Sequence, residues 1–203
     1  MTEDEARDWV ATRFGKVAQA RLAAFSTLVA DEALQQNLIA SSTMTHIWTR
    51  HIVDSAQLVE RASEQPGDWL DVGSGAGFPG MVAAVLGRNV TMVEPRRRRV
   101  EFLRHCVETL GISGSRVTLG KVEALPPSPF AIVSARAVAA LPKLLQIAER
   151  CADSGTLWLL PKGRSAQEEV AAARQTWHGT FHVEHSITDP SAMIVVATGI
   201  RRR

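Results

Sequence analysis

Residues 1–65 have apolar positions at helical spacing. Thr2 and Glu5 match a capping box, in which each side chain bonds the backbone amide of the other residue, and apolar side chains then recur three or four positions apart. The stretch that follows, up to residue 62, contains two more segments with helical spacing and one loop-like segment between them. The sequence predicts a helix ending near Phe14, a second over 16–36, a loop over 37–44 and a third, amphipathic helix over 45–62.

From Trp69 the pattern changes to short runs rich in Val, Ile, Leu and Thr, separated by helical segments. This alternation predicts a parallel sheet with helices on both faces. Strands are expected within 69–73, 89–95, 116–125, 130–137 and 155–163, and helices over 79–86, 97–110 and 139–151, with a short turn near 122–125.

The last part of the chain has no further helical segment between its strand-like runs. Residues 180–187 and 191–200 are both strand-like and are joined by the turn sequence TDP, so we predict an antiparallel hairpin at the sheet edge. A parallel α/β core that ends in such a hairpin is the arrangement of class I S-adenosylmethionine-dependent methyltransferases. The fold class predicted is therefore α/β, with a Rossmann-like methyltransferase sheet over 66–203 and a helical N-terminal extension over 1–65.

A glycine-rich loop follows the first predicted strand and matches two cofactor patterns. Gly75, Gly77 and Gly80 give G-x-G-x-x-G, which is typical of dinucleotide sites. Asp71, Gly73, Gly75 and Gly77 give D-x-G-x-G-x-G, which is typical of S-adenosylmethionine sites. We expect Asp71 to repel a pyrophosphate and to tolerate a cationic methionine group, which favours the methyl donor.

Polar residues also end the next predicted strands, where ligands of open α/β sheets bind. Glu94 suits ribose hydroxyls, a role common to both cofactor classes. Val122 and Glu123 lie where an adenine ring should stack, although Glu123 could equally be a solvated residue at a helix start. Arg136 ends the fourth strand in place of the Asn/Asp/Ser-Pro-Pro-aromatic motif of exocyclic-amine methyltransferases, which indicates a different target atom.

Charge is concentrated in arginines, although the net charge of the 203 residues is only +2. Nineteen of 23 basic side chains are arginine, and seven of these lie in the runs Arg96–Arg99 and Arg201–Arg203. The total could reflect genome composition, whereas the first run suits phosphate contacts. We expect the terminal run to be a disordered, solvated end.

Other features predict a cytoplasmic protein that is not membrane-bound. The N-terminal residues are acidic rather than signal-like, and no apolar run reaches the length of a membrane span. Cys106 and Cys151 are expected to be reduced, and no metal-ligand spacing occurs. Trp48 and Trp69 are expected in the core.

Several motifs together resemble the bacterial small-subunit rRNA (guanine-N7) methyltransferase family, RsmG or GidB. The resemblance covers nearly the whole chain. It depends on NLIAS (37–41), RHIVDS (50–55), LDVGSGAGFPG (70–80), RRVEFLRH (98–105), KVEALP (121–126), SARAVA (134–139) and LPKG (160–163).

The resemblance implies a cofactor, a substrate and a set of site residues. The cofactor would be S-adenosylmethionine, converted to S-adenosylhomocysteine, and the target would be guanine N7 in the 530 loop of 16S rRNA, presented as RNA or as the small ribosomal subunit. N7 carries no proton, so no general base is expected, and no metal or obligate protein partner is implied; we expect a monomer. The cofactor residues would be Asp71, Gly73, Gly75, Phe78, Glu94, Val122, Glu123 and Arg136; the reaction pocket would contain Asn37, His51, Arg136 and Lys162; and RNA would contact Arg96, Arg97, Arg98, Arg99 and Lys121.

Three other functions are also compatible with the sequence. A methyltransferase of the same fold could act on a small molecule or a protein, and an NAD(P)-dependent oxidoreductase or a non-catalytic RNA-binding module would share some of these features. His51 and Asp54, three positions apart, would share a helix face, either as a structural pair or at the mouth of the pocket.

Overall fold

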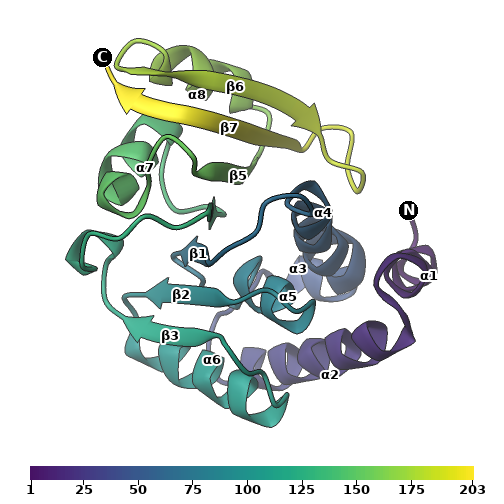
Figure 1. Cartoon of the computed structure of the whole chain (residues 1–203). Helices are drawn as coiled ribbons and strands as arrows, with labels where there is room; N and C mark the ends of the chain where they lie inside the picture. The colour runs from purple at the N-terminus through teal and green to yellow at the C-terminus, as the bar shows by residue number, and fades with distance from the viewer.

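A seven-stranded sheet forms the centre of the computed structural model, which describes residues 1–203 apart from the side chain of Ser41 (Figure 1). The strand order is β3-β2-β1-β4-β5-β7-β6. The strands are β1 (Trp69–Val72), β2 (Val90–Glu94), β3 (Arg116–Leu119), β4 (Ile132–Ala135), β5 (Leu157–Lys162), β6 (Trp177–His185) and β7 (Met193–Arg202).

The pairing of the strands confirms the predicted fold class. The first five strands pair in parallel, and β7 pairs antiparallel with both β5 and β6. The predicted hairpin is therefore present, with β7 next to β5 and β6 at the edge. Both strands are displaced by two or three residues from their predicted positions, because the pairing continues to Trp177 opposite Arg202.

The C-terminal arginines belong to this hairpin, so the expectation of a disordered end is wrong. Arg202 pairs with Glu149 at 2.6 Å, and its guanidinium lies 5.2 Å from the centre of the Trp177 ring. The amide of Arg203 donates to the carbonyl of Thr176. Strand pairing and stacking hold these residues although they are exposed.

Most helices lie near their predicted positions, with three differences. The second helix ends at Ala33, a short helix occupies part of the predicted loop, and one helix after β5 was not predicted. The capping box of the first helix is present. The helices are α1 (Glu3–Phe14), α2 (Lys16–Ala33), α3 (Ser41–Met44), α4 (Asp54–Arg61), α5 (Gly80–Val85), α6 (Arg97–Thr109), α7 (Leu141–Ala148) and α8 (Ala166–Ala173), with a π-helical turn η1 (Trp48–Val53) and 3-10 turns η2 (Val122–Ala124) and η3 (Glu149–Cys151).

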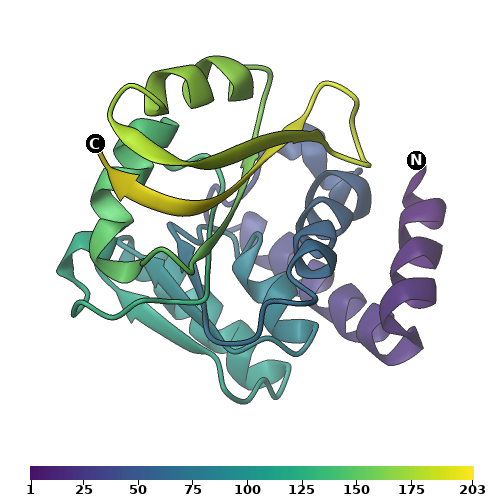
Figure 2. The ribbon, with the colours of Figure 1, turned by 45° about the horizontal axis from the view of Figure 1, so that its top comes forward.

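Two apolar cores cover the faces of the sheet. One contains Trp48, Phe25 and Trp69, and so joins the N-terminal helices to α5 and α6. The other joins α7 and α8 to the hairpin through residues such as Leu144 and Trp177. Both Trp48 and Trp69 are fully buried, as predicted, and the two cysteines are free and buried. In Figure 2 the N-terminal helices and the C-terminal end of the hairpin lie on opposite sides of the molecule.

No described helix is both long and apolar enough to cross a membrane.

Candidate active site

The glycine loop turns sharply after β1 and satisfies most of its own amides. Gly73, Gly75 and Gly77 have φ of +66°, +58° and +95°, a region that only glycine adopts without strain. The amide of Gly73 donates to the carbonyl of Val93 at 2.8 Å, and that of Gly77 to the carbonyl of Ser74 at 2.7 Å. These amides are consequently not free to bind a ligand.

Asp71 lies beneath the loop and caps the next helix. Its side chain is fully buried; Oδ1 accepts from Ser134 Oγ at 2.7 Å, and Oδ2 accepts from the amide of Gly80, the first residue of α5, at 3.1 Å. Burial raises the pKa of Asp71 to about 6, against the lowering effect of these hydrogen bonds. Asp71 therefore orders the loop from below and does not line a cavity.

Glu94, the last residue of β2, also accepts hydrogen bonds from backbone amides, but unlike Asp71 it lines a cavity. It is 3% exposed; Oε2 accepts from the amide of Gly75 at 2.9 Å and Oε1 from the amide of Arg96 at 3.0 Å. Both the loop and the start of α5 are thus already capped by carboxylates. A pyrophosphate at this turn would meet two negative charges and few free amides, in contrast to a dinucleotide site.

A cavity of about 400 Å³ opens at the carboxyl ends of β1, β2 and β3. It contains four of the eight residues expected to hold the cofactor, whereas Asp71, Gly75, Phe78 and Arg136 are not among its lining residues. The four are Gly73, Glu94, Val122 and Glu123, and the cavity is also lined by Arg96, Arg99 and Lys121, which were expected to contact RNA.

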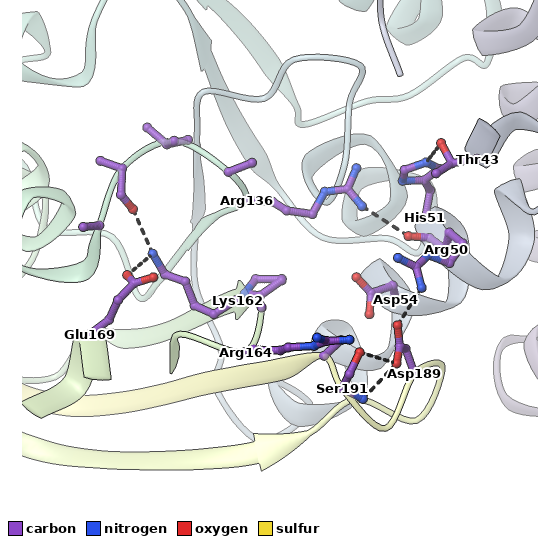
Figure 3. A pocket seen from close by; sticks show the side chains of 17 residues that line it. Thr43, Arg50, His51, Asp54, Arg136, Lys162, Arg164, Glu169, Asp189 and Ser191 are labelled. Atoms are coloured by element: carbon purple, nitrogen blue, oxygen red, sulfur yellow. Dashed lines mark hydrogen bonds and ion pairs between the residues drawn. The ribbon is translucent and has the colours of Figure 1, made fainter. Parts of the chain in front are cut away.

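A second cavity, of about 710 Å³, lies at the ends of β4 and β5 (Figure 3). The two cavities share residues 137–139, which form the wall between them. The N-terminal extension supplies one side of the second cavity, through Thr43, Arg50, His51 and Asp54. Three predicted pocket residues, His51, Arg136 and Lys162, are brought together here, although they come from distant parts of the chain.

Asn37 lies outside both cavities. It lines a separate surface pocket, and its carbonyl accepts from Arg99 Nη2 at 3.3 Å. This contact connects the stretch before α3 to the arginine run. Asn37 therefore positions Arg99 and does not reach the reaction pocket directly.

The imidazole of His51 is held neutral by its surroundings. It stacks on Phe78 with ring centres 5.0 Å apart, its Nε2 lies 3.0 Å from Thr43 Oγ1, and its buried Nδ1 has no partner among the described residues. Burial, together with Arg136 and Arg50, lowers the pKa of His51 to about 3. Such an imidazole is a poor proton acceptor.

Arg136 also lies against the Phe78 ring and reaches the N-terminal extension. Its guanidinium is 5.2 Å from the centre of Phe78, and Nη1 donates to the carbonyl of Arg50 at 3.4 Å. Burial lowers the pKa of Arg136, while attraction to Asp54 and Asp71 opposes this. Phe78 is thus a platform for His51 and Arg136.

Lys162 supports the wall between the cavities. It is 9% exposed, and Nζ donates to the carbonyl of Ala139 at 2.8 Å and to Glu169 Oε2 at 2.7 Å. The same Oε2 accepts from the amide of Leu141 at 2.7 Å. Two side chains, one from β5 and one from α8, therefore hold the segment from Ala139 to Leu141 at both ends.

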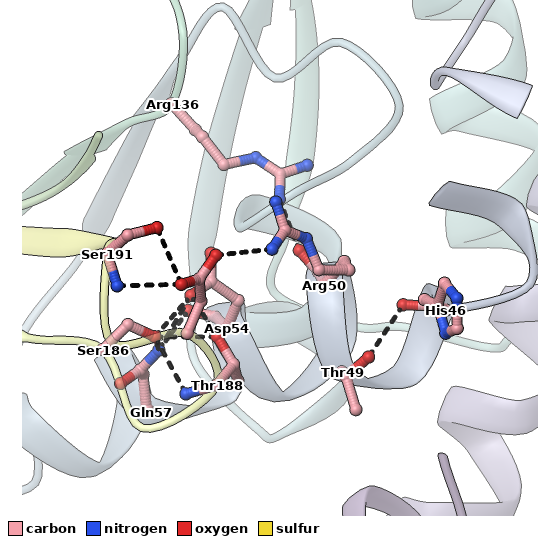
Figure 4. A network of polar contacts seen from close by, with 10 residues as sticks. His46, Thr49, Arg50, Asp54, Gln57, Arg136, Ser186, Thr188 and Ser191 are labelled. Carbon is pink, nitrogen blue, oxygen red and sulfur yellow. Dashed lines mark hydrogen bonds and ion pairs between the residues drawn. The ribbon is translucent and has the colours of Figure 1, made fainter. Parts of the chain in front are cut away.

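Asp54 and Arg50 connect α4 and η1 to the turn between β6 and β7 (Figure 4). Oδ1 of Asp54 lies within hydrogen-bond distance of Gln57, Ser186 and Thr188, and Arg50 pairs with Asp189 at 2.6 Å. Contacts to Ser191 and Arg50 lower the pKa of Asp189 to about 2. The side chains of His51 and Asp54 form no hydrogen bond with each other in the described residues, although the amide of Asp54 donates to the carbonyl of His51, and both residues line the second cavity.

Sequence reasoning missed four charged residues that line the second cavity: Arg50, Arg164, Glu169 and Asp189. Arg50 belongs to the RHIVDS motif and Arg164 directly follows LPKG, so the motifs did carry a signal for these two. Glu169 and Asp189 have no such marker, because their partners are distant or in another element.

The arginine run lies at the rim of the first cavity. Arg96, Arg97 and Arg98 are exposed, and α6 begins at Arg97 with no acidic residue in its first turn. Positive charge at a helix N-terminus opposes the helix dipole, so the run is unfavourable for the helix itself. A polyanion would compensate for this.

Among the described residues, no group of three or more His, Cys, Asp or Glu side chains is placed to hold a metal ion.

Comparison with solved structures shows the same fold at low sequence identity. Cofactor-bound Rv0187 from MTB aligns with a TM-score of 0.66 and 16% identity, over 98% of this chain and 97% of that one. A mutant of MtNAS in complex with S-adenosylmethionine aligns with a TM-score of 0.61 and 16% identity, over 90% and 76%. These are structures of the class I methyltransferase fold.

Sequence comparison gives much closer relatives. The family described as GidB, rRNA small subunit methyltransferase G, matches residues 18–192. Proteins named ribosomal RNA small subunit methyltransferase G are 49% identical in Rhizorhabdus wittichii, over 100% of this chain and 95% of that protein, and 46% identical in Novosphingobium aromaticivorans, over 97% and 88%. With this similarity along nearly its full length, the chain belongs to the rRNA small subunit methyltransferase G family.

Proposed function

We propose that this protein transfers the methyl group of S-adenosylmethionine to N7 of a guanine in the 530 loop of 16S rRNA. The observation that carries the proposal is the pair of adjoining cavities at the carboxyl ends of the strands, divided only by residues 137–139. One cavity suits a phosphate-free nucleoside, and the other is large and polar enough for a nucleotide base. The names of the relatives support rRNA of the small subunit as the substrate.

The residues of the first cavity fit S-adenosylmethionine better than a dinucleotide. Glu94 presents a carboxylate for the ribose hydroxyls, Val122 offers an apolar surface for the adenine, and Glu123 lies beside it. Asp71 and Glu94 occupy the amides that a pyrophosphate would need. When bound there, S-adenosylmethionine supplies an electrophilic methyl group on a positively charged sulfur.

The chain's own contribution to the reaction is positioning. Guanine N7 has an in-plane lone pair and no proton, so no side chain needs to act as a base, and the neutral His51 is consistent with that requirement. Orienting two reactants can lower a barrier by roughly 7–11 kcal/mol. We assign this orientation to the 137–141 segment, held by Lys162 and Glu169, and to Arg136 on the Phe78 platform.

The surrounding basic residues would bind the RNA. Arg96, Arg99 and Lys121 border the cofactor cavity, with Arg97 and Arg98 exposed beside them, and Arg50 and Arg164 border the second cavity. The target base must be unstacked or already unpaired to enter, which costs a few kcal/mol at most for a loop base. Phosphate contacts would offset that cost and make binding depend on salt.

The proposal extends to the organisation of the protein. Residues 1–65 would be a helical extension that completes the base cavity, and 66–203 the methyltransferase core. The protein would act as a monomer in the cytoplasm, where its substrate RNA is made.

Methyl transfer to defined RNA tests the proposal. Small subunits and naked 16S rRNA from cells lacking this protein are incubated with labelled S-adenosylmethionine, and the labelled base is mapped by chemical cleavage at 7-methylguanine. We expect one labelled guanine in the 530 loop. Label at another atom or RNA, label only in protein, or binding of NAD(P) without any affinity for S-adenosylhomocysteine would overturn the proposal.

A further inference from the structure

Asp54 lines the second cavity, and only one of its two carboxylate oxygens has hydrogen-bond partners. Oδ1 lies 3.0 Å from Gln57 Nε2, 2.9 Å from Ser186 Oγ and 3.2 Å from Thr188 Oγ1. No hydrogen bond to Oδ2 is found in the described part of the chain, although Asp54 is only partly exposed and lines the cavity. One oxygen is thus fixed in place by three donors, and the other is left for a ligand.

The other acidic groups of this cavity are already neutralised. Glu169 pairs with Lys162 at 2.7 Å, and Asp189 pairs with Arg50 at 2.6 Å. Within the described residues, Asp54 forms no ion pair shorter than 4 Å; the nearby charge of Arg136 acts on it only at longer range. Asp54 is therefore the acidic group best able to receive hydrogen bonds from a bound molecule.

The position of Asp54 relative to the cofactor cavity defines which edge of a base it would meet. Residues 137–139 separate the cavities, and Lys162, bonded to Ala139, lies on that side. Figure 3 shows Asp54 across the cavity from Lys162 and Glu169. If the N7 edge of a purine faces the wall, its N1 and N2 positions face away from it, toward Asp54.

Guanine is the base whose far edge complements a carboxylate. Its N1–H and exocyclic N2 amino group are adjacent donors, and the two lone pairs of the free Oδ2 can accept from both. Adenine instead has an unprotonated N1, whose lone pair would repel Oδ2. Hypoxanthine keeps N1–H but lacks the N2 amino group.

We propose that Asp54 selects guanine by accepting hydrogen bonds from N1–H and N2–H, and that its charge favours the reaction itself. As the N7 lone pair forms the bond to the methyl carbon, the bond from that carbon to sulfur breaks with its electron pair, and no proton leaves. The purine becomes positively charged, so its N1–H becomes a stronger donor. The contact to Asp54 thus strengthens toward the transition state, which raises kcat.

This inference rests on the proposed function, and a binding experiment separates the two. Guanosine and inosine 5′-monophosphates are titrated into the full-length protein with saturation-transfer NMR as the readout. We expect guanosine monophosphate to bind about tenfold more tightly than inosine monophosphate. Asp54→Asn should abolish that preference, because the three donors around Oδ1 hold the amide oxygen at that position and turn the NH₂ group toward the ligand.

The matched control is Ser186→Ala. It removes one donor to Oδ1 but leaves the carboxylate, so it should keep the preference for guanosine monophosphate while losing some thermal stability. Affinity for S-adenosylhomocysteine, measured by calorimetry, should be equal in all three proteins. With small subunits as substrate, Asp54→Asn should lower kcat about 100-fold and change KM less than about threefold.

Three results would overturn the role of Asp54. These are equal affinity of the wild-type protein for the two nucleotides, no binding of guanosine monophosphate at millimolar concentration, or a preference that survives Asp54→Asn. The first two need no variant, so they hold even if Asp54→Asn fails to fold. If the mapped methyl group is at guanine N7 in any of these cases, the proposed function stands and only the role of Asp54 fails.

Discussion

The environment of the His51 side chain makes its protonation costly for the fold. The folded protein lowers its pKa from 6.5 to about 3, so the neutral form is the one that the fold stabilises. This stability is fully present above pH 6.5 and is lost as the pH falls toward 3. At pH 5 an unfolded chain would bind a proton at this histidine and the folded chain would not.

We expect His51→Gln to make the protein less sensitive to acid. Between pH 7 and pH 5 the wild-type free energy of unfolding should fall by about 2 kcal/mol more than that of the variant, from the linkage of this one group. Urea unfolding at the two pH values measures the difference. Replacing the exposed His46 by Gln serves as the control and should leave the wild-type pH dependence unchanged.

Gly73 is a second position at which a single substitution should have a large effect, in this case on ligand binding. A Cβ there would lie 2.7 Å from Cγ2 of Val138, on the wall between the cavities, and the residue has φ of +66°. Gly73→Ala should weaken binding of S-adenosylhomocysteine by about tenfold or more, because strain and a clash of about 1–2 kcal/mol each would be relieved by a shift of the loop or of Val138, which displaces the wall of the cofactor cavity. Calorimetry checks this.

The double variant Gly73→Ala/Val138→Ala separates the two causes. Removing Cγ2 relieves the clash but leaves the backbone strain, so affinity should recover only in part. No recovery would indicate that the glycine is needed for its conformation or for contact with the ligand, and full recovery would indicate that only the clash matters.

Residue identities at the site were easier to predict from the sequence than their orientations. The loop motif identified Asp71 and Phe78, but the structure buries both. Asp71 faces Ser134, which is 63 positions away, and the partners of Phe78 come from the N-terminal extension and the end of β4. A local pattern does not contain this information, because these contacts form only when distant segments pack.

At the scale of elements, the fold class was predicted well and the helix after β5 was missed. The alternation of apolar runs predicted all seven strands, since period and turn residues are local signals. Residues 166–173 are a short, alanine-rich segment with Val170 as the single large apolar side chain, so periodicity gave no clear prediction. The π-helical turn at Trp48–Val53 was likewise predicted as ordinary helix.

Helix α8, which the sequence did not predict, supports the wall between the two cavities. Lys162 on β5 and Glu169 on α8 hold the segment from Ala139 to Leu141. We expect Lys162→Met to leave the partly buried Glu169 without its cation, to destabilise the protein by about 1–3 kcal/mol, and to weaken both S-adenosylhomocysteine and RNA binding. Thermal unfolding and the two binding assays measure these effects.

The exposed Lys16, remote from both cavities, provides a charge-matched control as Lys16→Met. It should leave stability and both affinities near the wild-type values. Loss of RNA binding alone in Lys162→Met would show that Lys162 contacts the substrate and does not position the wall.

At the scale of the whole molecule, the sheet separates the two arginine runs. Arg96 follows the carboxyl end of β2, at the edge where both cavities open. Strand β7 runs antiparallel to β5, and its first residue, Met193, pairs with Lys162 at the cavity end. Its last residues, Arg201 and Arg202, pair with β6 beyond the opposite end of β5.

This topology predicts different roles for two runs that look alike in sequence. Replacing Arg96, Arg97 and Arg98 by Gln should weaken binding of a 530-loop RNA and lower the slope of log affinity against log salt by about 2–3, as expected for three lost phosphate contacts. Affinity for S-adenosylhomocysteine should change little. Arg99 is left in place because it holds the carbonyl of Asn37.

Replacing Arg201 and Arg203 by Gln is the control, with Arg202 retained for its pairing with Glu149. Fluorescence anisotropy at several salt concentrations should give the wild-type slope for this variant, because neither Arg201 nor Arg203 lines either cavity. If the tail variant loses as much RNA affinity as the Arg96–Arg98 variant, the RNA must reach around the hairpin, and binding is not confined to the cavity edge. If neither variant changes the slope of log affinity against log salt, Arg96–Arg98 do not contact phosphates. The positive charge that binds RNA must then come from Arg50, Arg164 and Lys121.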